Sequence, residues 1–143
     1  MLISTRGRYA LRVMADLAEH AGEGYIPMKD VAARQGISLK YLEKILPVLA
    51  KNGIVTGIQG KGGGYRLNRD PKNYTLGEIL RLTEGTLAPV ACLECGAEKC
   101  PRADQCQTLP VWQGLNHVVS AYLDGITLAD LIAGRVDPTG KYE

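Results

Sequence analysis

The fold is set by residues 28–67, which read MKDVAARQGISLKYLEKILPVLAKNGIVTGIQGKGGGYRL. Met28 to Gln35 predicts a short amphipathic helix, and Gly36 ends it. Ser38 stands where the N-cap of a second helix belongs. That second helix places apolar side chains inward at Leu42, Ile45, Leu46 and Leu49. Two short helices joined by a glycine-containing turn are typical of a helix-turn-helix, whose second helix lies in the major groove of DNA.

The outer face of this second helix is polar and carries candidate base contacts. They are Lys40, Tyr41, Glu43 and Lys44. Pro47 lies within the same helical pattern, although its backbone nitrogen has no hydrogen to donate. We therefore expect a kink or break at Pro47, which limits the base-reading part to about Leu39 to Leu46.

A glycine-rich hairpin follows the two helices. Residues 54–58 form one strand pattern, and Tyr65 and Leu67 belong to the returning strand. The tip, Gly60 to Gly64, lets the backbone approach a phosphate or enter a minor groove, while Lys61 and Arg66 add positive charge. Helix, helix and basic hairpin, in this order, predict a winged helix-turn-helix.

The helix expected before this unit, Thr5 to His20, begins with three arginines. Arg6, Arg8 and Arg12 face the positive end of the helix dipole, which disfavours cations. A bound anion would relieve that conflict, so contact with DNA phosphates is one interpretation and ordinary exposed arginines are the other.

The distribution of charge agrees with a DNA-binding first half. Residues 1–75 hold 12 Lys and Arg against 6 Asp and Glu, whereas residues 76–143 hold 5 against 9. A basic half suits a chain whose first part meets phosphates. The composition, 45% apolar and 22% charged, is that of a globular protein. No apolar run approaches the roughly 18 residues of a membrane span, and no secretory signal is recognisable, so we expect a cytoplasmic protein.

The second half predicts two further helices before a short terminal one. Thr75 to Glu84 opens with a capping box, in which Glu78 is expected to reach back to the N-cap backbone. Pro110 to about Asp124 has an apolar face wide enough to pair across a two-fold axis, giving a homodimer on palindromic DNA. The alternative is that this helix folds back on its own core. Thr127 caps the short final helix.

The predicted fold class is therefore mainly α: a winged helix-turn-helix domain with a small β-hairpin wing, plus a long C-terminal dimerisation helix. We divide the chain into a DNA-binding domain (1–84), a cysteine-bearing loop (85–108), the dimerisation helix with the short C-terminal helix (109–134), and a flexible tail (135–143).

All four cysteines lie in residues 92–106, CLECGAEKCPRADQC, with the spacing C-x2-C-x4-C-x5-C. In a reducing compartment, thiolates crowded onto one loop indicate metal ligands rather than disulfides. Spacing alone leaves zinc and an iron–sulfur cluster equally open. A thiol oxidoreductase is disfavoured, because its C-x2-C begins a helix in a βαβ setting that is missing here. A winged helix used only for protein contacts is the remaining alternative.

At this point several motifs are recognisable together. ISTRGRYAL (3–11), GISLKYLEKIL (36–46), KNGIV (51–55), GKGGGYRL (60–67), CPRADQC (100–106) and ITLADL (126–131) resemble the IscR-type bacterial winged-helix regulators. The resemblance covers nearly the whole chain. It implies a homodimeric transcription regulator, not an enzyme, in which a loop before the long helix binds an iron–sulfur cluster that alters affinity for promoter DNA.

The resemblance also implies the cluster ligands. Cys92, Cys100 and Cys106 match the three cluster cysteines of the family. The familiar fourth ligands are missing, since Leu109 stands at the histidine position of the best-known regulator and Arg8 at the carboxylate position of a nitric-oxide-sensing branch. We expect Cys95 to complete the set, with Glu94 and Glu98 as other candidates. His20 is assigned a structural role, and His117 a surface or interface role.

The family's serine, tyrosine and glutamate at the positions of Ser38, Tyr41 and Glu43 approach DNA, whereas Gln59 stands where an arginine is common. The complete predicted DNA-binding set is Arg6, Arg8, Ser38, Lys40, Tyr41, Glu43, Lys44, Gln59, Gly60, Lys61, Gly62 and Arg66. A [2Fe-2S] cluster is favoured over [4Fe-4S], with Zn as the alternative metal. Control of iron–sulfur biogenesis genes is the predicted role, and nitric oxide sensing or cysteine metabolism remain open.

Overall fold

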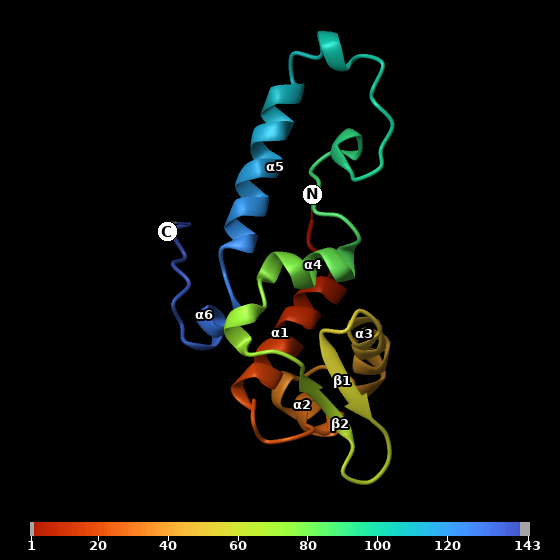
Figure 1. Ribbon diagram of the computed structural model, residues 1–143, viewed down its shortest axis with the longest axis vertical. Helices are drawn as coiled ribbons and strands as arrows, with labels where there is room; N and C mark the ends of the chain where they lie inside the picture. The colour runs from red at the N-terminus through yellow and green to blue at the C-terminus, as the bar shows by residue number, and fades with distance from the viewer. Residues whose placement is uncertain (1, 141–143) are drawn as a thin grey trace.

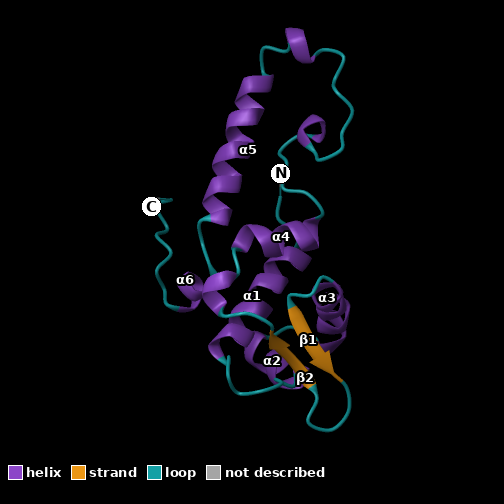
Figure 2. Ribbon diagram, viewed as in Figure 1, coloured by secondary structure: helices purple, strands orange, loops and turns teal. Residues whose placement is uncertain are grey.

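The computed structural model describes residues 2–140 and contains six α-helices and one antiparallel hairpin within them. The elements are α1 (Thr5–Glu19), α2 (Met28–Gln35), α3 (Leu39–Lys51), β1 (Val55–Ile58), β2 (Gly64–Leu67), α4 (Leu76–Glu84), α5 (Leu109–Asp124) and α6 (Leu128–Ile132) (Figures 1 and 2). Single turns of 3-10 helix lie at Pro71–Asn73, Ala91–Leu93 and Ala103–Gln105. The order confirms the predicted winged helix-turn-helix. No helix in the described part is long and apolar enough to cross a membrane.

The core lies around α1, which is the central helix of the body. It packs against α4, α6, α2 and β2. Fully buried side chains from five elements and the loops between them meet there; the largest are Tyr74, Met14, Leu17, Leu42, Ile45, Leu46, Leu49, Ile54, Ile79 and Leu128. We call α1 to α4, the hairpin and α6 the winged body.

The helix-turn-helix forms through the local signals predicted for it. Gly36 ends α2 in the left-handed conformation, at φ 64°, which suits a residue without a Cβ. The Ser38 hydroxyl accepts a hydrogen bond from the backbone nitrogen of Tyr41 at 3.1 Å, and this bond caps α3.

Of the kink or break expected at Pro47, the break does not occur. α3 is helical for 13 residues and continues through the proline to Lys51. Pro47 is exposed, whereas Leu46 and Leu49 on either side of it are fully buried. Packing of these leucines stabilises the last turn despite the missing backbone donor, as tertiary contacts commonly override local propensity. The helix therefore extends beyond Leu46, where the base-reading part was expected to end.

The wing is a regular two-stranded ladder anchored at its base. Val55 pairs with Leu67 and Ile58 with Gly64, which leaves residues 59–63 as the tip. The segment before α2 adds a bridge, because Ile26 and Tyr65 exchange backbone hydrogen bonds of 2.8 and 3.0 Å. A Cβ on Gly64 would lie 2.1 Å from the Ile26 carbonyl oxygen, so only glycine permits this approach.

The capping prediction for α4 is half right. The Thr75 hydroxyl accepts from the backbone nitrogen of Glu78 at 3.1 Å, as expected. The Glu78 carboxylate, however, accepts two hydrogen bonds from Arg69, at 2.6 and 3.1 Å, instead of reaching back to the N-cap. A charge-assisted pair is stronger than a bond to a neutral amide. The complete capping box occurs in α6, between Thr127 and Asp130.

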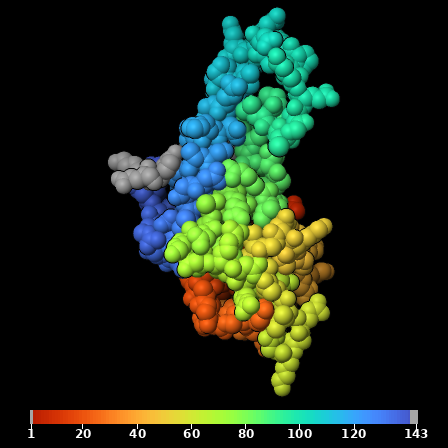
Figure 3. Space-filling model, in the orientation of Figure 1, coloured from red at the N-terminus to blue at the C-terminus, as the bar shows by residue number. Residues whose placement is uncertain are grey.

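α5 leaves the winged body, and the chain then returns to it. No residue of α5 is buried, and the helix projects from the body; the cysteine loop, residues 85–108, runs from the end of α4 to the far end of α5 (Figures 1 and 3). After α5, Ile126 and Leu128 enter the core, with backbone hydrogen bonds of 2.9 and 3.0 Å to residues 76 and 74. The short C-terminal helix, which we had grouped with the dimerisation helix, thus packs on the winged body.

The base of α5 is fixed to α4 by one ion pair. Arg81 donates to both carboxylate oxygens of Asp124, at 2.6 and 3.0 Å. The expected flexible tail began at residue 135, yet Arg135 pairs with Asp130 and Val136 packs against the core. The rest of that expected tail, residues 141–143, lies outside the described residues.

Candidate nucleic-acid interface and metal centre

The exposed face of α3 carries three charged side chains predicted to contact DNA. Lys40, Glu43 and Lys44 are all exposed. The Ser38 hydroxyl accepts the capping hydrogen bond of α3. Tyr41 is half-buried, because its ring packs edge-on against Tyr9 of α1 with the centroids 5.3 Å apart. This contact joins the first turn of α3 to the N-terminal half of α1.

The predicted arginine cluster at the start of α1 divides into two roles. Arg6 and Arg8 are exposed, and Arg8 donates to the Thr5 hydroxyl at 3.1 Å. Arg12 instead donates to the carbonyl oxygen of Gln35 and lies over the ring of Tyr9, 5.3 Å from its centroid. Two arginines therefore remain available to phosphates, whereas the third ties α1 to the end of α2.

The tip of the wing is exposed and follows directly on β1, the strand that packs against α3. Gln59, Gly60, Lys61 and Gly62 are exposed, and the two glycines have φ of 92° and 79°, which side chains rarely adopt. Arg66 lies nearer the base of the wing, 4.6 Å over the ring of Tyr25. Lys61 is thus the cation of the tip.

A buried carboxylate that the sequence reasoning missed holds the first two helices together. Asp16 is 2% exposed and accepts hydrogen bonds from Arg34, at 2.7 and 3.0 Å, and from Gln35 at 2.9 Å. The signal was present, since an acidic residue stands on the apolar face of a helix between Val13 and Leu17. The carboxylate positions α2, and through it the turn into α3.

Acid should weaken this link. Desolvation by burial raises the pKa of Asp16, but the hydrogen bonds from Arg34 and Gln35 outweigh it and hold the pKa below its usual value. Because the pKa of Asp16 is lower in the folded than in the unfolded protein, its ionised carboxylate contributes stability that is complete at neutral pH. That stability is lost as pH falls through the folded pKa. We expect the free energy of unfolding, measured with urea from pH 7 to pH 3, to fall more steeply in the wild type than in Asp16→Asn. Parallel profiles would contradict the assignment.

Three of the four thiols line one pocket beside the start of α5. All four cysteines are unpaired thiols, with Cys92 and Cys95 exposed and Cys100 and Cys106 half-buried. The pocket has a volume of about 360 Å³ and is lined by Cys92, Leu93, Lys99, Cys100, Ala103, Asp104, Cys106, Leu109 and Gln113. Cys95, predicted as the fourth ligand, is not among these residues.

The donor chemistry of this pocket suits a thiophilic metal centre. Its thiols are the soft ligands of zinc and iron–sulfur clusters. A hydrogen bond with the Thr108 hydroxyl, at 3.4 Å, lowers the pKa of the Cys106 thiol and so favours the thiolate. Within residues 2–140, no three His, Cys, Asp or Glu side chains are yet arranged to hold an ion. Binding therefore requires the loop to close around the metal.

The cysteine loop is joined at its start to the helix that carries Arg6 and Arg8. Glu84, the last residue of α4, accepts hydrogen bonds from the backbone nitrogen and hydroxyl of Ser4, at 3.2 and 2.6 Å. A Cβ on Gly7 would lie 2.2 Å from the same carboxylate oxygen, so the glycine permits the contact. This contact connects the start of the cysteine loop to the first turn of α1.

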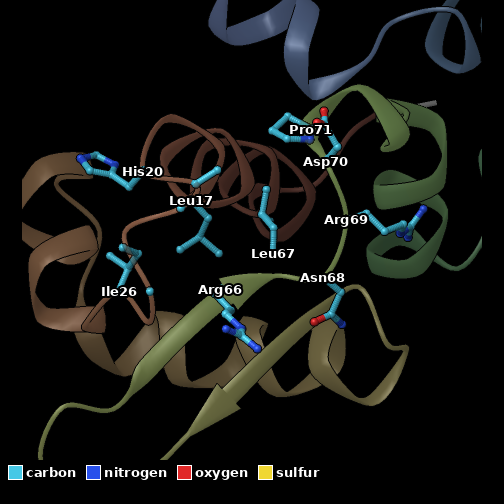
Figure 4. Close-up of a pocket in the computed structure, with 12 residues that line it drawn as sticks. Leu17, His20, Ile26, Arg66, Leu67, Asn68, Arg69, Asp70 and Pro71 are labelled. Atoms are coloured by element: carbon cyan, nitrogen blue, oxygen red, sulfur yellow. The ribbon is translucent and has the colours of Figure 1, made fainter.

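The molecule has a second groove, of about 680 Å³, between the end of α1 and the turn after β2 (Figure 4). Its charged groups already have partners. Arg69 pairs with Glu78, Asp70 accepts from the backbone of Lys72, and the ring of His20 lies 2.8 Å from the Asp16 carbonyl oxygen. We assign no ligand to it.

Comparison with known proteins matches nearly the whole chain. The Rrf2 family, described as "Iron-dependent Transcriptional regulator", matches residues 3–134. Proteins named HTH-type transcriptional regulator IscR are 39% identical in Serratia proteamaculans and 38% in Yersinia enterocolitica, each over 132 residues, covering 92% of this chain and 79% of the relative.

Two solved structures are similar over nearly their full length. The global cysteine regulator CymR of B. subtilis has a TM-score of 0.77 at 36% identity, covering 96% of this chain and 99% of CymR. IscR of T. potens has a TM-score of 0.72 at 33% identity, covering 100% of this chain and 93% of that protein.

Proposed function

This chain belongs to the Rrf2 family of transcriptional regulators, and we propose that it is a homodimeric regulator whose affinity for promoter DNA depends on an iron–sulfur cluster. Its relatives are DNA-binding regulators rather than enzymes, and the winged helix-turn-helix is the fold of that class. The observation that carries the cluster proposal is the gathering of Cys92, Cys100 and Cys106 at one pocket beside α5.

The DNA-binding surface proposed for this chain combines three parts. Arg6 and Arg8 bind phosphates, the face of α3 from Lys40 to Lys44 enters the major groove, and the wing tip approaches the backbone or minor groove. Glu43 accepts from cytosine N4 where that base is present and repels phosphate elsewhere. Ser38 acts through its cap on α3, and Tyr41 through its contact with Tyr9.

The dimer proposal is supported by the surface of α5. Val111, Leu115 and Val118 recur at helical spacing and are 58%, 39% and 57% exposed. An apolar stripe of this kind on a projecting helix favours a second copy of the same helix, because a two-fold contact buries the stripe twice. Two recognition helices related by that axis then suit a palindromic promoter site.

The mechanism is thermodynamic linkage between the pocket and the DNA surface. A bound cluster would supply an inorganic centre that responds to iron supply and oxidants, and Cys92, Cys100 and Cys106 would hold it as the loop closes. Closure acts on α1 through Glu84 and Ser4 and on the dimer through α5. If cluster binding changes DNA affinity by a given factor, DNA changes cluster affinity equally, typically by about 1–3 kcal/mol.

Iron–sulfur biogenesis genes are the proposed targets, in keeping with relatives named IscR. A second candidate is the control of cysteine metabolism, which the likeness to the cysteine regulator of B. subtilis favours. Footprinting on promoters of both gene classes decides between them. A zinc-stabilised form of the same regulator is tested by its lack of colour.

We expect Cys100→Ala to lose the metal centre. Wild-type protein prepared without oxygen should be brown and contain iron and acid-labile sulfide. The variant should be colourless, because one of the three thiol ligands is removed from the pocket. DNA affinity, measured by fluorescence anisotropy, should then differ between the two by about 5- to 150-fold. A wild-type protein with neither iron nor sulfide would end the cluster proposal, and zinc in its place would support the alternative.

A further inference from the structure

We propose that the carboxylate of Asp104 is the fourth ligand of the metal centre. This inference rests on the proposed function and concerns the same pocket. It replaces Cys95, Glu94 and Glu98, because none of these three side chains lines the pocket, whereas Asp104 does. The observation is therefore one of placement: a single anionic oxygen donor shares the pocket with three thiols.

The other lining residues do not offer an equivalent donor. Leu93, Ala103 and Leu109 have apolar side chains, and the ammonium group of Lys99 is a cation with no lone pair to give. Leu109 lines the pocket at the position where the family resemblance places a histidine ligand, but a leucine side chain has no atom that can bind a metal. Gln113 is the only other lining side chain with an oxygen.

Charge favours Asp104 over Gln113. A carboxylate is anionic at neutral pH and adds to the attraction for a cationic iron centre, whereas a carboxamide is neutral. The chain geometry favours it too. Asp104 lies in the one-turn 3-10 helix Ala103–Gln105, between Cys100 and Cys106. The segment that closes on the metal therefore carries the aspartate with it, whereas Gln113 is held on α5.

The present partner of Asp104 does not prevent this exchange. The carboxylate lies 3.3 Å from the Lys99 ammonium, and the two side chains are 85% and 75% exposed. Ion pairs this exposed contribute little to stability, because water solvates both groups. The bond to Lys99 is thus readily given up for a bond to iron.

The test compares four variants by metal content and spectra. Wild type, Asp104→Ala, Asp104→Cys, Cys95→Ala and Gln113→Ala are loaded with iron and sulfide under anaerobic conditions. Iron per protomer, visible absorption and circular dichroism, and the electron paramagnetic resonance signal of the reduced centre are then recorded. DNA binding by each iron-free protein checks that the winged body is folded.

We expect Asp104→Ala to lose iron at least 10-fold faster than wild type to a chelator, while Cys95→Ala and Gln113→Ala retain wild-type content and spectra. Asp104→Cys should retain iron but change the spectra, because a fourth thiolate has replaced an oxygen ligand. That change separates a ligand from a residue that only shapes the loop.

Other outcomes overturn the inference. If Asp104→Ala retains iron and shows wild-type spectra, the aspartate is not a ligand. This conclusion holds whether or not Cys95→Ala or Gln113→Ala loses iron. Such a result leaves the proposed function intact, because the wild type still binds iron through its three cysteines. Absence of iron from the wild type is a different result, and it removes both proposals.

Discussion

Val118→Glu is expected to make the protein monomeric and to lower its affinity for a palindromic promoter site by at least about 100-fold, because linked binding modules gain that much from joint engagement. Val118 is the last residue of the exposed apolar stripe on α5, after Val111 and Leu115, and is 57% exposed. Two glutamates brought together at the two-fold axis would be buried without partners, which strongly disfavours association. The winged body does not include this position, so the monomer should remain folded.

Light scattering gives the mass in solution, and anisotropy titration with a full and a half promoter site gives the affinities. His117→Glu is the matched control, since it adds the same charge at the neighbouring exposed position, which lies to one side of the stripe. The control should stay dimeric. A dimeric Val118→Glu protein would show that α5 is not the interface, whatever its effect on DNA binding.

Asp16→Ala is expected to lower the free energy of unfolding by about 3 kcal/mol, near the lower end of the range for breaking a buried ion pair. The substitution leaves the Arg34 guanidinium without its carboxylate and Gln35 without its acceptor. The lower end applies because the Arg34 side chain is 37% exposed, and water recovers part of the lost interaction. Urea unfolding followed by circular dichroism measures the change.

The matched control is Asp124→Ala, which also removes an aspartate bonded twice by an arginine. Both partners of that pair are exposed, at 40% for Arg81 and 45% for Asp124, so the expected loss is at most about 1 kcal/mol. Equal losses of unfolding free energy in the two variants would mean that burial of Asp16 does not make its ion pair more stabilising than the exposed pair. Because Asp16 positions α2, Asp16→Ala should also bind DNA more weakly than the wild type at urea concentrations below its unfolding transition.

Much of the fold could be predicted because its signals are local. The glycines at 36 and 85, the caps at Ser38 and Thr127, and the helical spacing of apolar residues depend on a few neighbouring residues. The candidate site was predictable to the extent that it depends on motif and spacing. Cys92, Cys100 and Cys106, which the family motif groups together, line one pocket, and the charged residues predicted on α3 and the wing are exposed.

The errors have a common cause in contacts between distant residues. A kink or break was expected at Pro47, but the helix does not break there, because buried leucines on both sides of it keep the turn helical. Glu78 was expected to bond its own N-cap, but Arg69 offers a stronger partner. Cys95 was expected to complete the ligand set because the family's familiar fourth ligands are missing; it is not among the residues that line the pocket, whereas Asp104 is.

The sequence by itself determined the winged helix-turn-helix, the family and the position of the thiols along the chain. Only the tertiary structure decided which arginine is bonded to α2, which carboxylate is buried, which thiols share a pocket, and how Glu84 connects the start of the cysteine loop to α1. The division follows from range. Turns, caps and helix faces depend on interactions within a few residues, whereas side chains far apart in the chain meet only after the core has packed.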